Sequence, residues 1–178
     1  EVGRDITIDQ LREQGYKGFY VAIGCQKGRK PGIENEDADG VYTAVDFLKK
    51  AGAEEGFAFE GDVVVVGGGN VAIDAARVSS RCTEHGISMY CLEQKEQMPA
   101  SKDEIAEALA ENVSLNCGWG PKEILVEDGH LTGIVFKKCL RVQDENGRFA
   151  PEYDENDTVS VPCRHIIFSV GQAIDWGH

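Results

Sequence analysis

VVVVGGGNVAIDAAR, residues 63–77, is the stretch of sequence that decides the fold. Its four consecutive valines are too apolar for a strand with one face in water, and they predict a central strand of a parallel sheet, covered on both faces. Three glycines end the strand, and a segment rich in small residues follows as far as Cys82. The stretch therefore predicts a strand, a tight turn and a closely packed helix.

The next segment completes a β–α–β unit. Gly86 is expected to stop the helix, and residues 87–92 form a second apolar run that predicts a strand, with Glu93 at its end. The whole unit spans about 30 residues, which is close to the minimum for two parallel strands joined by a helix.

The glycine turn matches the G-x-G-x-x-G/A pattern of dinucleotide-binding folds at Gly67, Gly69 and Ala72. Gly67 permits the tight turn, Gly69 lets a pyrophosphate approach the backbone, and Ala72 lets the helix lie close to the strand. The free N–H groups and the dipole of the helix N-terminus can then hold phosphates. The predicted phosphate site consists of Gly67, Gly68, Gly69, Asn70 and Val71.

The acid at the end of the second strand predicts which nucleotide binds. A carboxylate at Glu93 can accept hydrogen bonds from both ribose hydroxyls of NAD(H), and it repels the 2′-phosphate of NADP(H). Gln94 and Lys95 follow directly and belong to the same predicted site. Because Lys95 could reach a 2′-phosphate, NADP(H) stays open as the alternative to the favoured NAD(H).

The part of the chain before the valine strand carries weaker signals. A capping box at Thr7 predicts a short helix, and the apolar run 18–24 predicts a buried strand. Residues 25–38 are expected to form a loop, and apolar residues spaced three and four apart over 41–48 predict an amphipathic helix.

The part after Glu93 predicts a mixed architecture. A capping box at residues 101–104 begins a helix, and the alternation over 113–117 predicts a third parallel strand. Residues 123–142 read as an antiparallel hairpin, and 158–161 as another short strand. A last apolar run covers 165–171. We therefore expect an α/β fold: a Rossmann-like three-layer nucleotide-binding domain with a central parallel sheet, helices and a β-meander crossover.

Composition excludes several classes of protein and partner. The chain of 178 residues has 18 basic and 31 acidic residues, a net charge of −13, which argues against a nucleic-acid partner. No apolar run is long enough to span a membrane and no signal peptide is recognised, so no membrane association is expected. Six scattered cysteines predict inert thiols in a reducing cytoplasm. The four histidines form no catalytic or metal-ligating pattern, so no catalytic residue and no metal site are predicted.

Residues 65–77, followed by Met-Pro-Ala-Ser at 98–101, resemble the glutamate synthase small (β) subunit family of flavin-dependent pyridine-nucleotide oxidoreductases. Residues 22–24, together with 28–30 and 41–48, resemble the segment that enters the nicotinamide-nucleotide domain in that family, and residues 166–172 resemble the return to the flavin domain. The resemblance covers nearly the whole chain.

The resemblance implies an organisation in which the nucleotide domain is inserted into an FAD domain. Residues 1–30 would then be a stub of the FAD domain together with the segment that enters the nucleotide domain. The NAD(P)H-binding domain would be residues 31–164, and residues 165–178 would form the segment that returns to the FAD domain. Gly24 and Gly171 would lie at the cofactor boundary. The FAD motif of the family is absent from these 178 residues, so the chain alone is expected to be inactive.

The resemblance also implies a function: hydride transfer from NAD(P)H to FAD, with electrons passed to an iron–sulfur or other acceptor. The expected partners are the FAD domain of the same polypeptide and an iron–sulfur domain or subunit. The cofactors supply this chemistry, so no side-chain acid or base is needed. Many relatives carry an Arg-Arg pair that holds the 2′-phosphate of NADPH, and Leu92-Glu93 stands at that place here, which favours NADH.

Two other functions remain open at this point. A nucleotide-binding regulatory module without turnover would explain why the chain has one glycine motif and no FAD motif. An S-adenosylmethionine-dependent methyltransferase also uses a glycine-rich first turn and an acid after the second strand, although the spacing to Ala72 and the later meander count against it.

Overall fold

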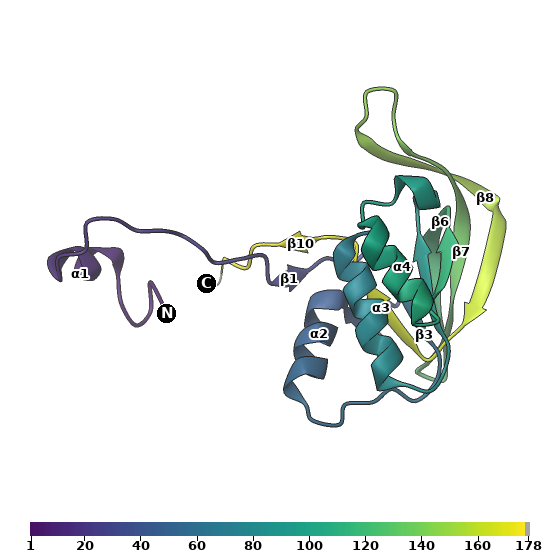
Figure 1. Ribbon diagram of the computed structural model, residues 1–178, viewed down its shortest axis with the longest axis horizontal. Coiled ribbons are helices and arrows are strands. Elements are labelled where there is room, and N and C mark those ends of the chain that lie inside the picture. The colour runs from purple at the N-terminus through teal and green to yellow at the C-terminus, as the bar shows by residue number, and fades with distance from the viewer. Residues whose placement is uncertain (177–178) are drawn as a thin grey trace.

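A five-stranded parallel sheet forms the centre of the protein (Figure 1). The computed structural model describes residues 1–176. The strand order across the sheet is β2-β9-β3-β4-β5, and every neighbouring pair is parallel. The five strands are β2 (Val41–Thr43), β9 (His165–Phe168), β3 (Val63–Val66), β4 (Ile87–Cys91) and β5 (Ser114–Cys117).

The valine strand β3 lies in the middle of the sheet and is buried on both faces, as its composition predicts. Its four valines are at most 2% exposed. Val63 and Val65 pack into the cluster on the helical side, whereas Val64 and Val66 pack into the cluster on the opposite side. This alternation follows from the two-residue period of a strand.

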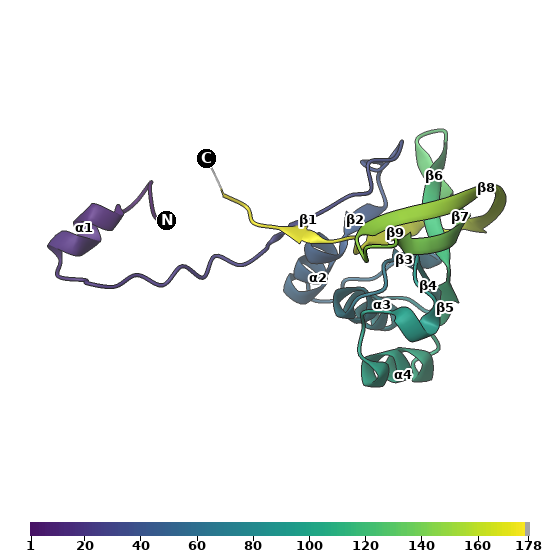
Figure 2. The same cartoon turned by 90° about the horizontal axis from the view of Figure 1, so that it is seen from above.

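Three helices cover one face of the sheet, and Figure 2 shows them together on one side of the strands. They are α2 (Ala44–Ala53), α3 (Asn70–Cys82) and α4 (Lys102–Ala110), with a single 3₁₀ turn, η1 (Lys95–Gln97), before α4. Phe47, Ile73 and Met89 are among the fully buried side chains between helices and sheet.

An antiparallel meander covers the other face. It consists of β6 (Trp119–Glu127), β7 (His130–Gln143) and β8 (Phe149–Pro162), in the order β6-β7-β8. Tyr90 of the parallel sheet stacks on Phe136 of the meander with ring centres 4.1 Å apart. After the meander the chain enters the parallel sheet as β9, between β2 and β3. The predicted three-layer fold with its meander crossover is confirmed.

Two predictions near the N-terminus are wrong. Residues 18–24 form no strand: they pair with no strand of residues 1–176 and are exposed, Tyr20 to 94%, although the Arg12 guanidinium lies 5.8 Å from the centre of the Phe19 ring. The helix predicted from residue 41 begins at Ala44, since Val41–Thr43 pair with β9 as the edge strand β2 and Thr43 serves as the N-cap. The short strand predicted at 158–161 is part of the longer β8.

The first 26 residues extend away from the body of the molecule (Figure 1). The capping box at Thr7 is confirmed, and it begins α1 (Ile8–Glu13), a helix with no buried residue. The arm joins the body where β1 (Lys27–Gly28) pairs antiparallel with β10 (Gln172–Ala173). Over residues 1–176 no helix is long and apolar enough to cross a membrane.

Candidate functional site: the glycine turn and the ends of the parallel strands

Gly67 makes the turn between β3 and α3, and its surroundings admit no side chain. Its φ is 147°, and a Cβ there would lie 2.4 Å from the carbonyl oxygen of Ser169. The Gly67 N–H donates to the carbonyl of Tyr90 at 2.9 Å, and the Ser169 N–H donates to the carbonyl of Val66 at 2.8 Å. The neighbouring strands therefore fix the start of the turn.

Gly69 is the N-cap of α3 and faces open space. A Cβ at this position would meet no heavy atom within 4 Å, and no side chain caps the helix at this end. The first N–H groups of a helix have no partner within the helix, and the helix dipole adds positive potential at the same point. A pyrophosphate can thus approach the backbone at Gly69, as its role in the motif requires.

Glu93 follows β4, and its side chain lies against the glycine turn. A Cβ at Gly68 would be 2.7 Å from Glu93 Oε2 and 3.2 Å from Cys91 Cβ. No residue within 1–176 donates a hydrogen bond to this half-buried carboxylate. Its oxygens therefore remain able to accept from hydroxyl groups of a ligand placed over the turn.

The Met-Pro-Ala-Ser segment, residues 98–101, is tied to the glycine turn by two hydrogen bonds. The Ala100 N–H donates to the carbonyl of Gly68 at 3.1 Å, and the Ser101 N–H donates to Asn70 Oδ1 at 2.9 Å. The Asn70 side-chain oxygen thus accepts a hydrogen bond from Ser101, the N-cap residue of α4, and does not cap its own helix, α3. The segment therefore packs against the glycine turn, although about 30 residues of sequence separate the two.

Gln94 and Lys138 meet beside Gly118, just beyond the end of β5. A Cβ at Gly118 would be 2.7 Å from Gln94 Nε2 and 3.3 Å from Lys138 Nζ. The Lys138 ammonium lies 4.6 Å from the ring centre of Trp119, and it forms no ion pair with any described residue. Sequence reasoning missed Lys138, because only the register of the meander brings β7 to this place.

Cys91 and Cys117 lie side by side on β4 and β5. Their sulfur atoms are 3.8 Å apart, and burial is the main cause that raises the pKa of both thiols. All six cysteines are free. Raised pKa values disfavour the reactive thiolate, in agreement with the prediction that these thiols are inert.

The other predicted site residues lie in different surroundings. Lys95 is exposed on η1, next to the strand ends. Gly171 lies two residues after Ser169 in the sequence, and its carbonyl accepts a hydrogen bond from the Arg29 N–H at 3.0 Å. Gly24 lies in the exposed arm, where Gln26 is its nearest neighbour, so the structure does not bring it to the glycine turn. The last two residues of the predicted return segment, 177 and 178, lie outside the described residues.

The three-layer fold, the open turn at Gly69 and the carboxylate beside Gly68 define a dinucleotide-binding domain of the Rossmann type. No protein-family model matches the chain. It is similar to NADP(+)-dependent formate dehydrogenase subunit beta of Moorella thermoacetica, with 32% identity over 98% of this chain and 25% of that protein. It is also similar to the glutamate synthase [NADPH] small chain of Escherichia coli, with 32% identity over 96% of this chain and 39% of that protein.

These similarities confirm the resemblance to the glutamate synthase small-subunit family, and they extend over nearly the whole chain. The chain spans between a quarter and two fifths of the length of these two relatives. The fold is shared with solved oxidoreductases: FprA of Mycobacterium tuberculosis has a TM-score of 0.77 at 19% identity, over 97% of this chain and 53% of FprA. Lactococcus lactis thioredoxin reductase has a TM-score of 0.60 at 20% identity, over 82% of this chain and 42% of that one.

Proposed function

We propose that this chain is the nicotinamide-nucleotide domain of a larger flavin-dependent oxidoreductase, in which a dinucleotide bound over the glycine turn passes hydride to FAD. The observation that carries the proposal is the geometry of the turn. Gly67 is closed in by Ser169, whereas Gly69 faces open space at the N-terminus of α3. The open space at Gly69 leaves the first N–H groups of α3 accessible to a pyrophosphate.

NADP(H) is the nucleotide we propose. The names of the relatives include NADP(+) and NADPH, and they favour NADP(H) over the NAD(H) that Glu93 alone predicts. Lys95, the residue for which NADP(H) stayed open as the alternative, supplies a cation next to the end of β4, the strand that Glu93 follows. The contribution of Glu93 is then to hold the ribose, while its charge limits how tightly a 2′-phosphate binds.

We take the nucleotide domain to be residues 31–164 together with β9, because β9 lies inside the central sheet. FAD would be held by other parts of the polypeptide, connected through residues 1–30 and through the segment after Phe168, with Gly24 and Gly171 at the boundary. The apolar side chains of the arm support this arrangement, since Tyr20 and Val21 are each at least 75% exposed. Large exposed apolar side chains in one segment are typical of a surface that another domain covers.

The residues of this domain would act by binding and orienting the nucleotide. The backbone at Gly69 and Asn70 would hold the pyrophosphate, and Glu93 would accept from the adenosine ribose. The cofactors supply the hydride chemistry, so we assign no acid or base. Electrons would leave through an iron–sulfur or other partner, and the six free cysteines fit a reducing cytoplasm.

The test has two parts. Calorimetric titration of this chain with NADPH, NADH and S-adenosylmethionine should give binding of the dinucleotides alone. The full-length protein, loaded with FAD, should lose its flavin absorbance when mixed with NADPH in the absence of oxygen. Binding without flavin reduction would favour the regulatory module, and binding of S-adenosylmethionine alone would favour the methyltransferase.

A further inference from the structure

Lys138 is a half-buried lysine at the edge of the nucleotide site that has no structural partner of opposite charge. Among the described residues its ammonium forms no ion pair, and its contact is with the face of the Trp119 ring, 4.6 Å away. The neighbouring Lys137 differs: its ammonium pairs with Glu155 at 2.6 Å and lies over Tyr153. A carboxylate of the meander thus neutralises Lys137, whereas the charge of Lys138 remains available to pair with an anionic ligand.

Lys138 is connected to the ribose end of the site through Gly118. The Gly118 N–H donates to the carbonyl of Glu93 at 3.0 Å, and the Gly118 carbonyl accepts from the Cys139 N–H at 2.9 Å. Lys138 Nζ and Gln94 Nε2 both approach Gly118 from the side. Beyond the effect of burial, the charge of Glu93 raises and that of Lys138 lowers the pKa of Cys139, so both charges lie within electrostatic reach of one thiol.

We propose that Lys138 is a specificity-determining residue of the nucleotide site, and that its ammonium binds the 2′-phosphate of NADP(H). This inference rests on the proposed function and names the group that recognises the phosphate. The Trp119 ring would hold the ammonium at the strand ends, where the carboxylate of Glu93 faces the ribose. The meander would then be part of the cofactor site as well as a cover for the sheet.

The chemistry at this position suits a phosphate better than another ligand. A lysine ammonium is a compact charge with three donors and is commonly used to bind phosphate oxygens. Gln94 Nε2, on the same side of Gly118, can donate a further hydrogen bond. NADH has a hydroxyl at this position, so it gains little from the ammonium.

The experiment measures the affinity of NADPH and of NADH for this chain and three variants: Lys138→Met, Lys138→Arg and Lys137→Met. Methionine keeps the apolar stem over Trp119, and Lys137→Met is a matched control that removes a charge one residue away. A charge-assisted contact with phosphate predicts about a tenfold loss of NADPH affinity in Lys138→Met. NADH affinity should stay within about twofold, Lys138→Arg should retain most of the NADPH affinity, and Lys137→Met should leave both unchanged.

The outcomes separate this inference from the function on which it rests. Equal losses for NADPH and NADH in Lys138→Met, or no loss for either, would overturn the role of Lys138 and leave dinucleotide binding intact. Failure of the unaltered chain to bind either dinucleotide would overturn both. Competition by 2′,5′-ADP and by 5′-AMP provides a second readout, because only the former should lose affinity in Lys138→Met.

Discussion

Replacing Gly69 by alanine should separate nucleotide binding from folding. The φ of Gly69 is −92°, which alanine adopts easily, and its Cβ would meet nothing within 4 Å. Alanine is a poorer N-cap than glycine, so we expect a loss of stability of about 0.5–1 kcal/mol. For a chain of this size that loss lowers the melting temperature by roughly 1–4 °C.

The same methyl group should strongly impair binding. It would occupy the space through which a pyrophosphate reaches the backbone N–H groups of α3. Loss of two hydrogen bonds to charged oxygens is worth about 3 kcal/mol, or roughly a hundredfold in the dissociation constant of NADPH. Calorimetric titration and thermal melting of the same preparations measure both effects.

Gly67→Ala is the matched control for this prediction. Its Cβ would lie 2.4 Å from the Ser169 carbonyl oxygen at a φ of 147°, so the free energy of unfolding should fall by at least about 2 kcal/mol. The reasoning is refuted if Gly69→Ala binds NADPH as tightly as the unaltered chain. It is also refuted if Gly69→Ala is destabilised as much as Gly67→Ala.

Three further predictions concern the surroundings of the turn. Glu93→Arg should raise the NADPH affinity by about tenfold relative to NADH in paired titrations; an unchanged ratio would contradict the assignment of Glu93 to the ribose. Asn70→Ala should remove the acceptor for the Ser101 N–H, lower the stability by about 1 kcal/mol and speed amide exchange over 98–101, whereas unchanged exchange would refute it. Cys25 is exposed, but burial raises the pKa of Cys163 to about 12, so a thiol reagent at pH 8 should modify Cys25 quickly and Cys163 only on unfolding.

The centre of the fold could be predicted because its signals are local. The valine run, the glycine turn and the alanine-rich helix lie within 20 residues of one another, and each has a composition typical of one structure. The position of Glu93 beside Gly68 followed from the rule that the carboxyl ends of adjacent parallel strands lie at the same edge of a sheet.

The parts that could not be predicted depend on distant pairing. Strand β2 is three residues long, and Val41 becomes a strand residue because it pairs with Ile166. Lys138 reaches the site through a meander whose register shifts at several bulges, which no local pattern reveals. The arm at 18–24 is apolar like a buried strand, but it pairs with no described strand and its residues are exposed.

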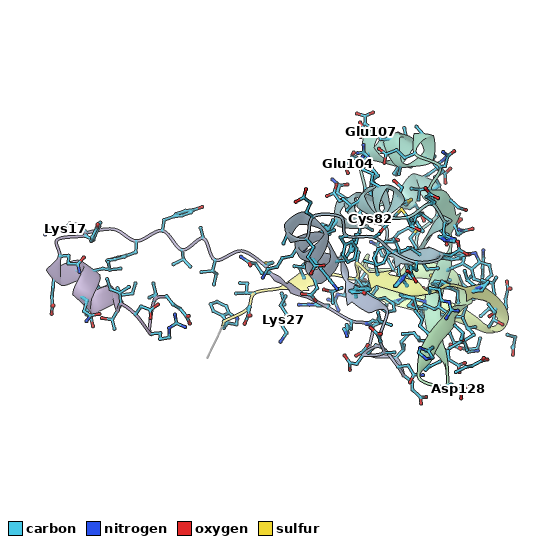
Figure 3. All side chains as sticks on the ribbon, turned by 90° about the horizontal axis from the view of Figure 1, so that it is seen from below. Lys17, Lys27, Cys82, Glu104, Glu107 and Asp128 are labelled. Atoms are coloured by element: carbon cyan, nitrogen blue, oxygen red, sulfur yellow. The ribbon has the colours of Figure 1, made fainter. Side chains whose placement is uncertain are left out.

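The view in Figure 3 shows the arm that carries Lys17 extending away from the body, while Glu104 and Glu107 lie with the helical layer. Glu104, in the first turn of α4, is only half-exposed, and its Oε2 is buried without a hydrogen-bond partner among the described residues. The capping box at residues 101–104 predicts the start of this helix, whereas the burial of the Glu104 carboxylate depends on tertiary packing that no local pattern reveals.

The most direct test of the central claim is to record the amide NMR spectrum of the isotopically labelled chain during titration with NADPH. The largest shifts should fall on the backbone N–H groups of Gly69, Asn70 and Val71, with smaller shifts at Glu93. Saturable binding that leaves these amides unmoved, or no binding at all, would contradict the claim that the glycine turn holds the pyrophosphate.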